Sequence, residues 1–389
     1  NNSPHAGSFQ IASGAPAQQR WVLRQSTRSV AAITTCKSWE IISTATPEPL
    51  ALPYKLLAER PVNCGERWLY DATEDVIAQA IEAAHLTASE VAAMNLYLGS
   101  SSFDISLTEV AYARELAADA GTALALRDPS FARLADTLAN RLHLGGSNFS
   151  FNTACTASAN ALLTAASHVS LGLIEHALVI GVELYNEITA LGFSGLDLLT
   201  RDIMKPFDDE RNGLVLGEAV SATIIGRANN TTHLHLLGGA TRCDTHSISA
   251  SEPTGSTIEG VIRSALHDAG LNTDDVGAIK AHGTASLSND EAEAAGMHRS
   301  FPTLPNICAI KPHIGHTLGA CGLTEALLCA AAAERNFLIG TQGISEHPGE
   351  LDVALNQYAR PLPAGALLLN YFGFGGNNTA LVLGPQHAD

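Results

Sequence analysis

Hydrophobic residues recur along the chain with two spacings, one typical of helices and the other of buried strands. From Arg67 onward the pattern is regular: residues 71–84 have helical spacing, and the apolar run 94–98 predicts a short strand. Residues 130–142 predict a second helix, which two glycines at 145–146 end. Helices and strands therefore begin to alternate in this part of the chain.

The alternation continues and then starts again after a polar break at residues 227–232. Before the break, strand 148–153 leads into the alanine-rich helix 155–170, and the apolar strands 177–181 and 219–225 follow. After the break, the pattern predicts strands at 234–240, 276–281, 306–310, 366–371 and 379–383 and helices at 256–269, 290–297 and 319–334. We expect two similar halves, each built on a mixed sheet covered by helices.

The first sixty residues carry a weaker signal. Residues 1–20 are small and polar without periodicity, which is typical of a disordered leader. The short apolar stretches that follow are broken by Pro47, Pro49 and Pro53. The predicted organisation is therefore a leader at 1–20, an N-terminal half at 21–230 and a C-terminal half at 231–389.

Composition narrows the class of function. Of 389 residues, 46% are hydrophobic and 16% charged, which indicates a globular chain, and the net charge of −17 disfavours binding to nucleic acids or anionic lipid surfaces. The seven cysteines are scattered without a CxxC pair, which is typical of a reducing, cytoplasmic compartment. No apolar run is long enough to predict a membrane span.

One cysteine occupies a position suited to a nucleophile. Cys155 lies in the segment FNTACTASA, between a predicted strand and a predicted helix. The free N–H groups and the dipole of a helix N-terminus stabilise a thiolate there. A buried, inert thiol is the ordinary alternative for a cysteine at this position.

Three further segments place polar or glycine-rich loops at strand ends, where the sites of α/β proteins assemble. His282 follows one strand in KAHGTAS, and His316 follows another in KPHIGHTLGA. The glycines of NYFGFGGNN, at residues 370–378, allow close backbone approach to a substrate. Each segment alone has an ordinary structural explanation, so their joint presence and order carry the inference.

Together the four segments resemble the β-ketoacyl-(acyl-carrier-protein) synthases of the elongating type, members of the thiolase superfamily. The corresponding family patterns are TACxxS, AHGTxTxxxD, KSxxGHxxGAxG and NxFGFGGxN. Residues 205–208, read KPFD, together with Arg211, Gly213, Gly217 and Glu218, are similar to the family's PFDxxRxGxxxGEG. The resemblance extends from Arg67 to Leu383 and implies a thiolase-like, duplicated α-β-α-β-α layered fold with a mixed five-stranded sheet in each half.

The chain departs from these patterns at a few positions. Ser286 replaces the second threonine of the first histidine motif, Pro312 replaces a serine, and Asn289 and Ala219 stand where glycine is usual. These changes leave the nucleophile and both histidines intact, so they bear on substrate preference. The first fifth of the chain does not match the family's glycine-containing first strand and loop.

The resemblance implies a decarboxylative Claisen condensation in fatty-acid, polyketide or polyene synthesis. Cys155 would hold the acyl group, and His282 and His316 would stabilise the enolate formed from malonyl-(acyl-carrier-protein). His313 is a rival for His316, but the spacing GHxxGA favours His316. The resemblance further assigns the oxyanion role to the backbone N–H groups of Cys155 and Phe372, and a gating role to Phe372 with Gly373 beside it. Core packing is the ordinary alternative for Phe372.

Two further pairs are expected near these residues. Glu325 follows His316 in an apolar stretch, where a charge is costly unless paired, so we expect a salt bridge to Lys311, which the resemblance places near the histidines. Thr284 and Ser286 are suited to hydrogen-bonding the amides of a phosphopantetheine arm, and turn capping is the ordinary alternative.

The resemblance also implies partners. An acyl carrier protein would deliver the substrates on its phosphopantetheine, with no separate cofactor and no metal. Carriers of this kind are acidic, and Arg60, Arg67, Arg201 and Lys205 are candidates for docking one. Family members are homodimers, or heterodimers with a second ketosynthase, and residues 177–181 are the strand expected to pair.

Two other functions compete with condensation. A ketosynthase-like partner subunit, similar to a chain-length factor, would bind acyl chains without catalysis, and such subunits often lose the cysteine that this chain keeps. A cysteine hydrolase would need one histidine and an orienting carboxylate or amide, which leaves the second histidine and Lys311 unexplained.

Overall fold

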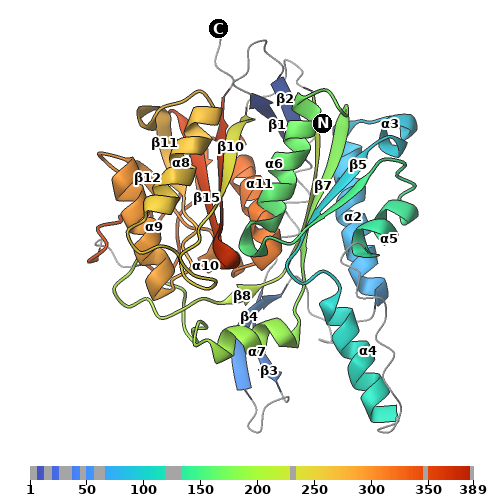
Figure 1. Cartoon of the computed structure of the whole chain (residues 1–389), viewed down its shortest axis with the longest axis horizontal. Helices are drawn as coiled ribbons and strands as arrows, with labels where there is room; N and C mark the ends of the chain where they lie inside the picture. The colour runs from blue at the N-terminus through green and yellow to red at the C-terminus, as the bar shows by residue number, and fades with distance from the viewer. Residues whose placement is uncertain are drawn as a thin grey trace.

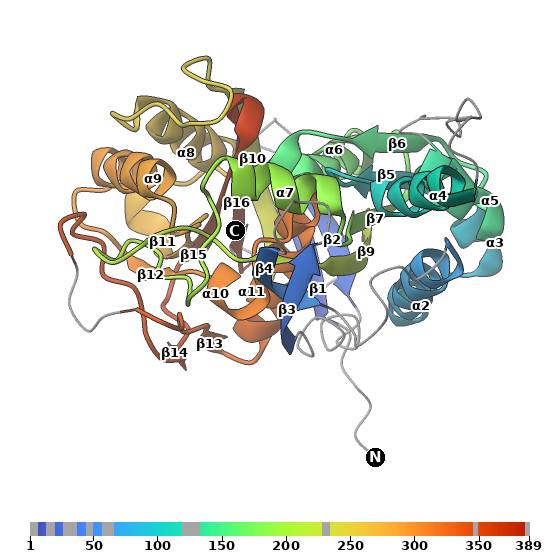
Figure 2. The same ribbon diagram turned by 90° about the horizontal axis from the view of Figure 1, so that it is seen from below.

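The computed structural model of the chain describes residues 7–12, 20–25, 37–43, 50–56, 66–118, 133–227, 234–344 and 349–385. Two large sheets stand side by side, with helices between them and on their outer faces (Figures 1 and 2). All described strands of the first sheet precede residue 228, and all those of the second follow residue 234.

The first sheet is mixed and has the strand order β1-β2-β9-β7-β5-β6. At its centre, β7 runs parallel to β5 and antiparallel to β9. The bounds are β1 (Gly7–Ala12), β2 (Arg20–Gln25), β5 (Asn95–Gly99), β6 (Asn148–Phe151), β7 (His176–Glu183) and β9 (Ala219–Arg227). Both faces of β7 are buried, so alternate residues enter separate cores and the strand reads as a continuous apolar run.

The second sheet has the order β10-β16-β15-β11-β12. Its strand β11 runs parallel to β12 and β15, whereas β16 is antiparallel to β15 and β10. The bounds are β10 (His235–Cys243), β11 (Val276–Lys280), β12 (Asn306–Cys308), β15 (Ala366–Gly373) and β16 (Asn377–Gly384). Each of β11, β12 and β15 leads into a segment that contains one of the sequence motifs described above.

Helices α6 (Ala157–Ser170) and α11 (Cys321–Glu334) fill the space between the two sheets (Figure 2). Helices α2 (Glu66–Ala84) and α5 (Arg133–Arg141) cover the outer face of the first sheet. Helices α8 (Ser256–Asp268) and α9 (Leu287–Ser300) cover the second. The α-β-α-β-α layering expected from the sequence is confirmed.

Smaller elements surround the layers. A three-stranded sheet β3-β4-β8 lies beneath the central helices in Figure 1, beside α7, and α4 projects from the body. The bounds are β3 (Lys37–Ser43), β4 (Leu50–Leu56), α3 (Ala88–Ala92), α4 (Ile105–Ala118), α7 (Glu187–Gly195), β8 (Leu216–Gly217), η2 (Thr273–Asp275), α10 (Lys311–Ile314), β13 (Phe337–Leu338) and β14 (Arg360–Pro361).

The structure corrects three expectations. The first sheet has six strands rather than five, because Gly7–Ala12 pairs antiparallel with β2 at its edge; these six residues are therefore not an irregular leader. The rest of residues 1–20, apart from Arg20, lies outside the described residues. Strand β7, which contains residues 177–181, is bonded on both edges, so it has no free edge for pairing with another subunit. Helices α4 and α7 were not predicted.

The division of the chain at residue 230 stays a prediction. Among the described residues, no helix is both long and apolar enough to cross a membrane.

Candidate active site

Cys155 sits in a tight turn between β6 and α6. The turn is the short 3₁₀ helix η1 (Ala154–Thr156), and Ala154 at its start has a φ of 49°, in the left-handed region that non-glycine residues rarely adopt. Helix α6 then passes so close to β5 that a Cβ on Gly99 would lie 2.3 Å from the Cα of Ser158. The strained turn and the close packing fix the sulfur above the sheet ends.

His316 lies before a second turn of the same form. Here η3 (Leu318–Ala320) leads into α11, and Leu318 has a φ of 44°. Two hydrogen bonds hold the backbone of His316 beside β8. The His316 N–H donates to the carbonyl of Val215, directly before β8, at 2.7 Å, and the His316 carbonyl accepts from the Gly217 N–H at 3.0 Å. The two turns are alike, and η1 and η3 contact each other.

His282 follows β11 and is fixed by a buried carboxylate. The N–H groups of His282 and Gly283 donate to the two oxygens of Glu293 on α9, at 2.8 and 2.9 Å. The side-chain amide of Asn370 donates to the same carboxyl group at 3.1 Å. Burial raises the pKa of Glu293, although these N–H groups act in the opposite direction.

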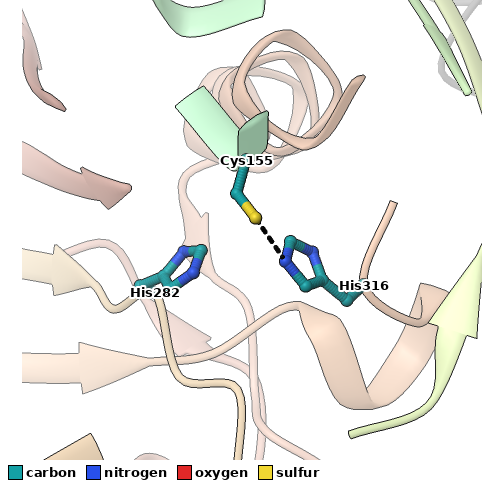
Figure 3. A group of neighbouring side chains, drawn as sticks. All are labelled: Cys155, His282 and His316. Atoms are coloured by element: carbon teal, nitrogen blue, oxygen red, sulfur yellow. Dashed lines mark hydrogen bonds between the residues drawn. The ribbon is translucent and has the colours of Figure 1, made fainter. Parts of the chain in front are cut away.

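The cysteine and the two histidines converge, as Figure 3 shows. Nε2 of His316 lies 3.0 Å from Sγ of Cys155. One ligand atom from each of Cys155, His282 and His316 falls within 4.8 Å of the others. The two imidazole rings meet edge to face at 5.4 Å between centroids. All three side chains are buried, so the chemistry they support takes place away from bulk water.

Hydrogen bonds fix which nitrogen of each imidazole carries the proton. Lys311 Nζ lies 3.2 Å from Nδ1 of His282, and the Leu318 N–H donates to Nδ1 of His316 at 3.2 Å. Because both Nδ1 atoms face donors, each neutral ring carries its proton on Nε2. His316 thus presents an N–H to the sulfur of Cys155.

Both histidines are held neutral. Burial is the largest cause that lowers the pKa of His282 well below its ordinary value, and the charge of Lys311 adds to it. Burial and Lys311 act in the same way on the pKa of His316. Neutral imidazoles can donate a hydrogen bond from Nε2 at physiological pH without first losing a proton.

Lys311 and Glu325 form the salt bridge expected from the sequence. The Nζ of Lys311 lies 2.8 Å from Oε1 of Glu325, and both side chains are fully buried. Burial alone would lower the pKa of Lys311, but the Glu325 carboxylate outweighs it, so the pKa is raised. Lys311 also donates to the carbonyl of His282 at 2.8 Å, which anchors the loop.

The thiol of Cys155 is protonated at rest. Burial raises its pKa to about 11, against the opposing effects of Lys311 and of the backbone N–H groups of Phe374 and of Cys155 itself. The N–H that faces the sulfur therefore belongs to Phe374 rather than Phe372. This position lies two residues after Phe372, for which the sequence predicted the oxyanion donor. The reason lies in the turn η4 (Phe374–Gly376), where Gly375 has a φ of 76° and the chain bends over Cys155.

The other glycine-loop residues have different places. The ring of Phe372 is buried and lies 5.8 Å from that of His282, which makes it a packing partner of the histidine. A Cβ on Gly373 would lie 3.2 Å from the Cys155 nitrogen. The ring of Phe374 is stacked on Phe193 of α7 at 5.6 Å, in a position that could gate access to the sulfur.

A pocket opens onto the three catalytic candidates. Cys155, His282 and His316 line it, and Thr284 and Ser286 line the same pocket. The hydroxyl groups of Thr284 and Ser286 lie 3.1 Å apart. Ser247, Ser249 and Ser251 add further hydroxyl-bearing residues, so the approach to the sulfur is lined by groups that can bond amides and hydroxyls.

His313 does not belong to this cluster. Its Nε2 lies 2.7 Å from the Gly340 carbonyl, in a separate part of the surface. The geometry therefore supports the choice of His316.

The spacing of Cys155, His282 and His316 would by itself suit a metal ion such as zinc. The charge around them disfavours metal binding. A metal-bound histidine usually donates its other ring N–H to a carboxylate, but here the Lys311 ammonium occupies that position beside Nδ1 of His282. The arrangement fits an anion in front of the imidazoles better than a dication.

Sequence reasoning missed four supporting residues. Phe374 lies in the motif NYFGFGGNN, so its position was available from the sequence. Glu293 and Glu183 could not be predicted from the local sequence, because the N–H groups that they bind belong to other loops. Glu183 accepts N–H groups from Ser101, Ser102 and Gly319, which ties the turn after His316 to the end of β5. Lys280 could have been found, since a charged residue in an apolar strand requires a partner.

Comparison with known proteins finds one family along most of the chain. The model of the beta-ketoacyl synthase N-terminal domain matches residues 68–230, and that of the C-terminal domain matches residues 234–345. The chain is 28% identical over 261 residues to the chloroplastic 3-oxoacyl-[acyl-carrier-protein] synthase I of Arabidopsis thaliana, covering 63% of this chain and 55% of that protein. It is 29% identical over 261 residues to 3-oxoacyl-[acyl-carrier-protein] synthase 2 of Coxiella burnetii, covering 62% of each.

Solved structures share the fold. A β-ketoacyl synthase from Burkholderia phymatum matches with a TM-score of 0.79 and 21% identity over 98% of both chains. A ketosynthase from Xenorhabdus doucetiae, in complex with its chain length factor, matches with a TM-score of 0.76 and 23% identity over 99% of this chain and 100% of that one. The matched segment spans about half to three fifths of the curated relatives named above. Domain matches over most of the chain, together with the shared fold, show that it belongs to the β-ketoacyl synthase family of the thiolase superfamily.

Proposed function

We propose that the chain condenses an acyl thioester with malonyl-(acyl-carrier-protein) and releases a β-ketoacyl product. The observation that carries this proposal is the convergence of one thiol and two neutral imidazoles, with the Nε2 proton of His316 directed at the sulfur. A hydrolase needs a histidine that accepts the proton of the nucleophile, whereas the fixed tautomer of His316 presents a donor instead.

In the first half-reaction Cys155 attacks the thioester carbonyl and forms the acyl-enzyme. The new C–S bond replaces the bond to the carrier sulfur, and the proton of the Cys155 thiol leaves with the carrier thiol. The negative oxygen of the tetrahedral intermediate accepts hydrogen bonds from the N–H groups of Cys155 and Phe374. A preorganised pair of donors stabilises this charge where it forms.

In the second half-reaction the malonyl thioester loses carbon dioxide. The electron pair of the broken C–C bond passes into an enolate, whose oxygen accepts from the Nε2 protons of His282 and His316. The enolate carbon then attacks the acyl carbonyl on Cys155, forming the new C–C bond and breaking the C–S bond. The expelled thiolate takes up one proton from solvent, which is the proton that the overall reaction consumes. Lys311 keeps His282 in the tautomer that this step requires.

Acylation is tested by intact mass. Incubation with an acyl-carrier thioester should add the mass of the acyl group, and Cys155→Ala should abolish this addition, whereas Cys243→Ala removes an exposed thiol and should not. Absence of the mass shift in the unchanged protein would favour a non-catalytic partner subunit.

Decarboxylation is tested separately with malonyl thioester alone. His282→Ala and His316→Ala should each lower the rate about 100-fold or more, because each removes one donor to the enolate oxygen. His313→Ala serves as the matched control, since this histidine bonds Gly340 outside the site. Unchanged rates in the first two variants would refute their role.

The partners belong to the same proposal. Ketosynthases of this fold are seen in complex with an acyl carrier protein or a chain length factor. We infer that this chain takes its substrates from a carrier's phosphopantetheine arm through the pocket lined by Thr284 and Ser286, with no separate cofactor. Of the docking candidates, Arg201 is exposed and Lys205 is paired with Glu210; Arg60 and the side chain of Arg67 lie outside the described residues.

Dimerisation would use the edge strand β6 rather than β7. Among the described strands, β6 pairs only with β5, so its other edge is open to a second ketosynthase-fold chain. That chain would be a second copy of this one or a related subunit.

A further inference from the structure

Lys280 is a buried charge that the proposed mechanism leaves unused. It is the last residue of β11, two residues before His282, and its exposed fraction is 1%. A lysine in a buried strand is costly unless its charge is compensated. The groups around Lys280 must therefore compensate its charge.

The Nζ of Lys280 has three acceptors. It donates to Oε2 of Glu325 and to the Asn370 carbonyl at 2.7 Å, and it lies 3.6 Å from the centroid of the Tyr371 ring. An ammonium has three N–H groups to match a carboxylate, a carbonyl and a π face. A neutral amine would turn its lone pair toward one of these electron-rich groups, so the geometry fits a charged lysine.

Lys311 repeats this arrangement on the other oxygen of the same carboxylate. Its Nζ faces Oε1 of Glu325 and the carbonyl and Nδ1 of His282. One carboxylate thus serves two ammonium groups. The cluster of Lys280, Lys311 and Glu325 carries one positive charge in excess, in direct contact with His282.

We infer that Lys280 is a positioning residue for both imidazoles: by engaging Oε2 of Glu325, it leaves a net positive charge at Lys311 that keeps His282 and His316 neutral with Nε2–H toward the sulfur. An imidazolium would place a second N–H on Nδ1, against Lys311 for His282 and against the Leu318 N–H for His316. The inference deepens the proposed function, because neutral donors are what the enolate step requires.

Other titratable groups face the cluster from each neighbouring element. They are Cys308 on β12, Cys321 and Cys329 on α11, Tyr371 on β15 and Glu293 on α9. Burial raises the pKa of the three thiols and of Tyr371, which keeps all four neutral at physiological pH. Glu293 is linked to Lys280 through Asn370 and is bonded to the N–H groups of His282 and Gly283.

Burial is the main cause that lowers the pKa of both histidines, and the charges of Lys311 and Lys280 act in the same direction. Removing one lysine charge should therefore raise the pKa of the imidazoles. A second substitution that restores the net positive charge of the cluster should lower the pKa of the imidazoles again.

The test is NMR of ¹⁵N-histidine-labelled protein titrated between pH 5 and 8, with His282→Gln and His316→Gln used to assign the two rings. In Lys280→Met the cluster has no net charge, so the pKa of at least one ring should rise by about one unit, a tenfold change in proton affinity. Lys280→Arg and the surface control Arg263→Met should leave both rings neutral. Unchanged titration in a folded Lys280→Met would overturn the inference.

A double variant separates charge from packing. Lys280→Met with Glu325→Gln restores one net positive charge on Lys311, so both rings should return to the neutral state seen in the unchanged protein. If Lys280→Met alone does not fold, the double variant is compared with Glu325→Gln instead. Glu325→Gln leaves two positive charges, on Lys280 and Lys311, so its imidazole rings should stay neutral to a lower pH than those of the double variant. Equal titration of the rings in these two proteins would refute the charge argument.

The reaction supplies an independent readout. The acid limb of malonyl thioester decarboxylation should move to higher pH in Lys280→Met and stay in place in Lys280→Arg. Absence of decarboxylation in the unchanged protein would refute the proposed function, while the histidine titration would still decide the role of Lys280.

Discussion

At the scale of single residues, the site combines a thiol that resists ionisation with donors that wait for negative charge. Burial raises the pKa of Cys155 to about 11, whereas Lys311 and two backbone N–H groups favour the thiolate. The low dielectric that disfavours the resting thiolate also strengthens every hydrogen bond to an oxyanion. The site is therefore arranged for the charges that develop during the reaction rather than for a charged resting state.

Alkylation of Cys155 should report this resting state. Because the pKa of the thiol is about 11, the rate of reaction with iodoacetamide should rise about tenfold per pH unit between pH 7 and 10. Lys311→Met removes a charge that lowers this pKa, so alkylation should slow throughout the range. Peptide mapping would measure both, and a plateau at neutral pH would show that the thiolate is already formed at rest.

The donor at Phe374 can be tested through its neighbour. Gly375 has a φ of 76°, so Gly375→Ala introduces strain of about 1–2 kcal/mol and should displace the Phe374 N–H from the sulfur. Acylation of Cys155 should fall about 100-fold, the usual cost of losing one oxyanion donor. Gly192→Ala, at an open position of α7, is the matched control. Acylation at the normal rate in Gly375→Ala would exclude this donor.

At the scale of elements, two similar turns meet. The chain passes into α6 through Ala154 and into α11 through Leu318, both at positive φ, and the helices then pack against each other between the sheets. The contact is tight at Gly322, where a Cβ would lie 2.3 Å from the Ala159 nitrogen. The separation of α6 and α11 thus sets the distance between Cys155 and His316.

Gly322→Ala should push the two helices apart. Because the clash is with backbone, the substitution should cost about 1–3 kcal/mol of unfolding free energy and lengthen the 3.0 Å contact between Cys155 and His316. Thermal unfolding and malonyl thioester decarboxylation would be measured together. Gly192→Ala should instead be neutral or stabilising. An intact rate in Gly322→Ala would mean that helix spacing does not position the pair.

The elements show what sequence reasoning could reach. Continuous apolar runs predicted β7 and β15, because strands buried on both faces contain little else. Helix α4 escaped prediction because its apolar residues are not confined to one face: Tyr112 and Leu116 are exposed. Strand β1 could not be predicted from local pattern, since it is defined by its antiparallel pairing with β2. Motifs located Cys155, His282 and His316, but the identity of the donor at Phe374 depended on the bend at Gly375.

At the scale of the molecule, the two sheets have unequal exposure at their edges. In the described part of the chain, the outer side of β12 in the second sheet is bonded, because the Asn356 N–H donates to the Ile307 carbonyl at 2.8 Å. Strand β6, at the outside of the first sheet, pairs only with β5. Strand β6 also leads directly into the turn that holds Cys155. A partner bound along β6 would therefore support the nucleophile from outside the subunit.

Ser150→Pro tests this edge. The carbonyls of Ser147 and Phe151 accept from Leu96 in β5 and from Ser100 directly after it. The alternate residue Ser150 therefore directs its N–H toward the open side. Proline removes that N–H without breaking the bonds to β5, and should convert a dimer seen by light scattering into monomers, with loss of condensation. Ser150→Thr keeps the N–H and should keep the dimer. A dimer that survives Ser150→Pro would place the interface elsewhere. If the unchanged chain is monomeric, the edge of β6 should instead bind a co-expressed ketosynthase-fold partner. A chain that forms neither a dimer nor this complex would refute the proposed pairing.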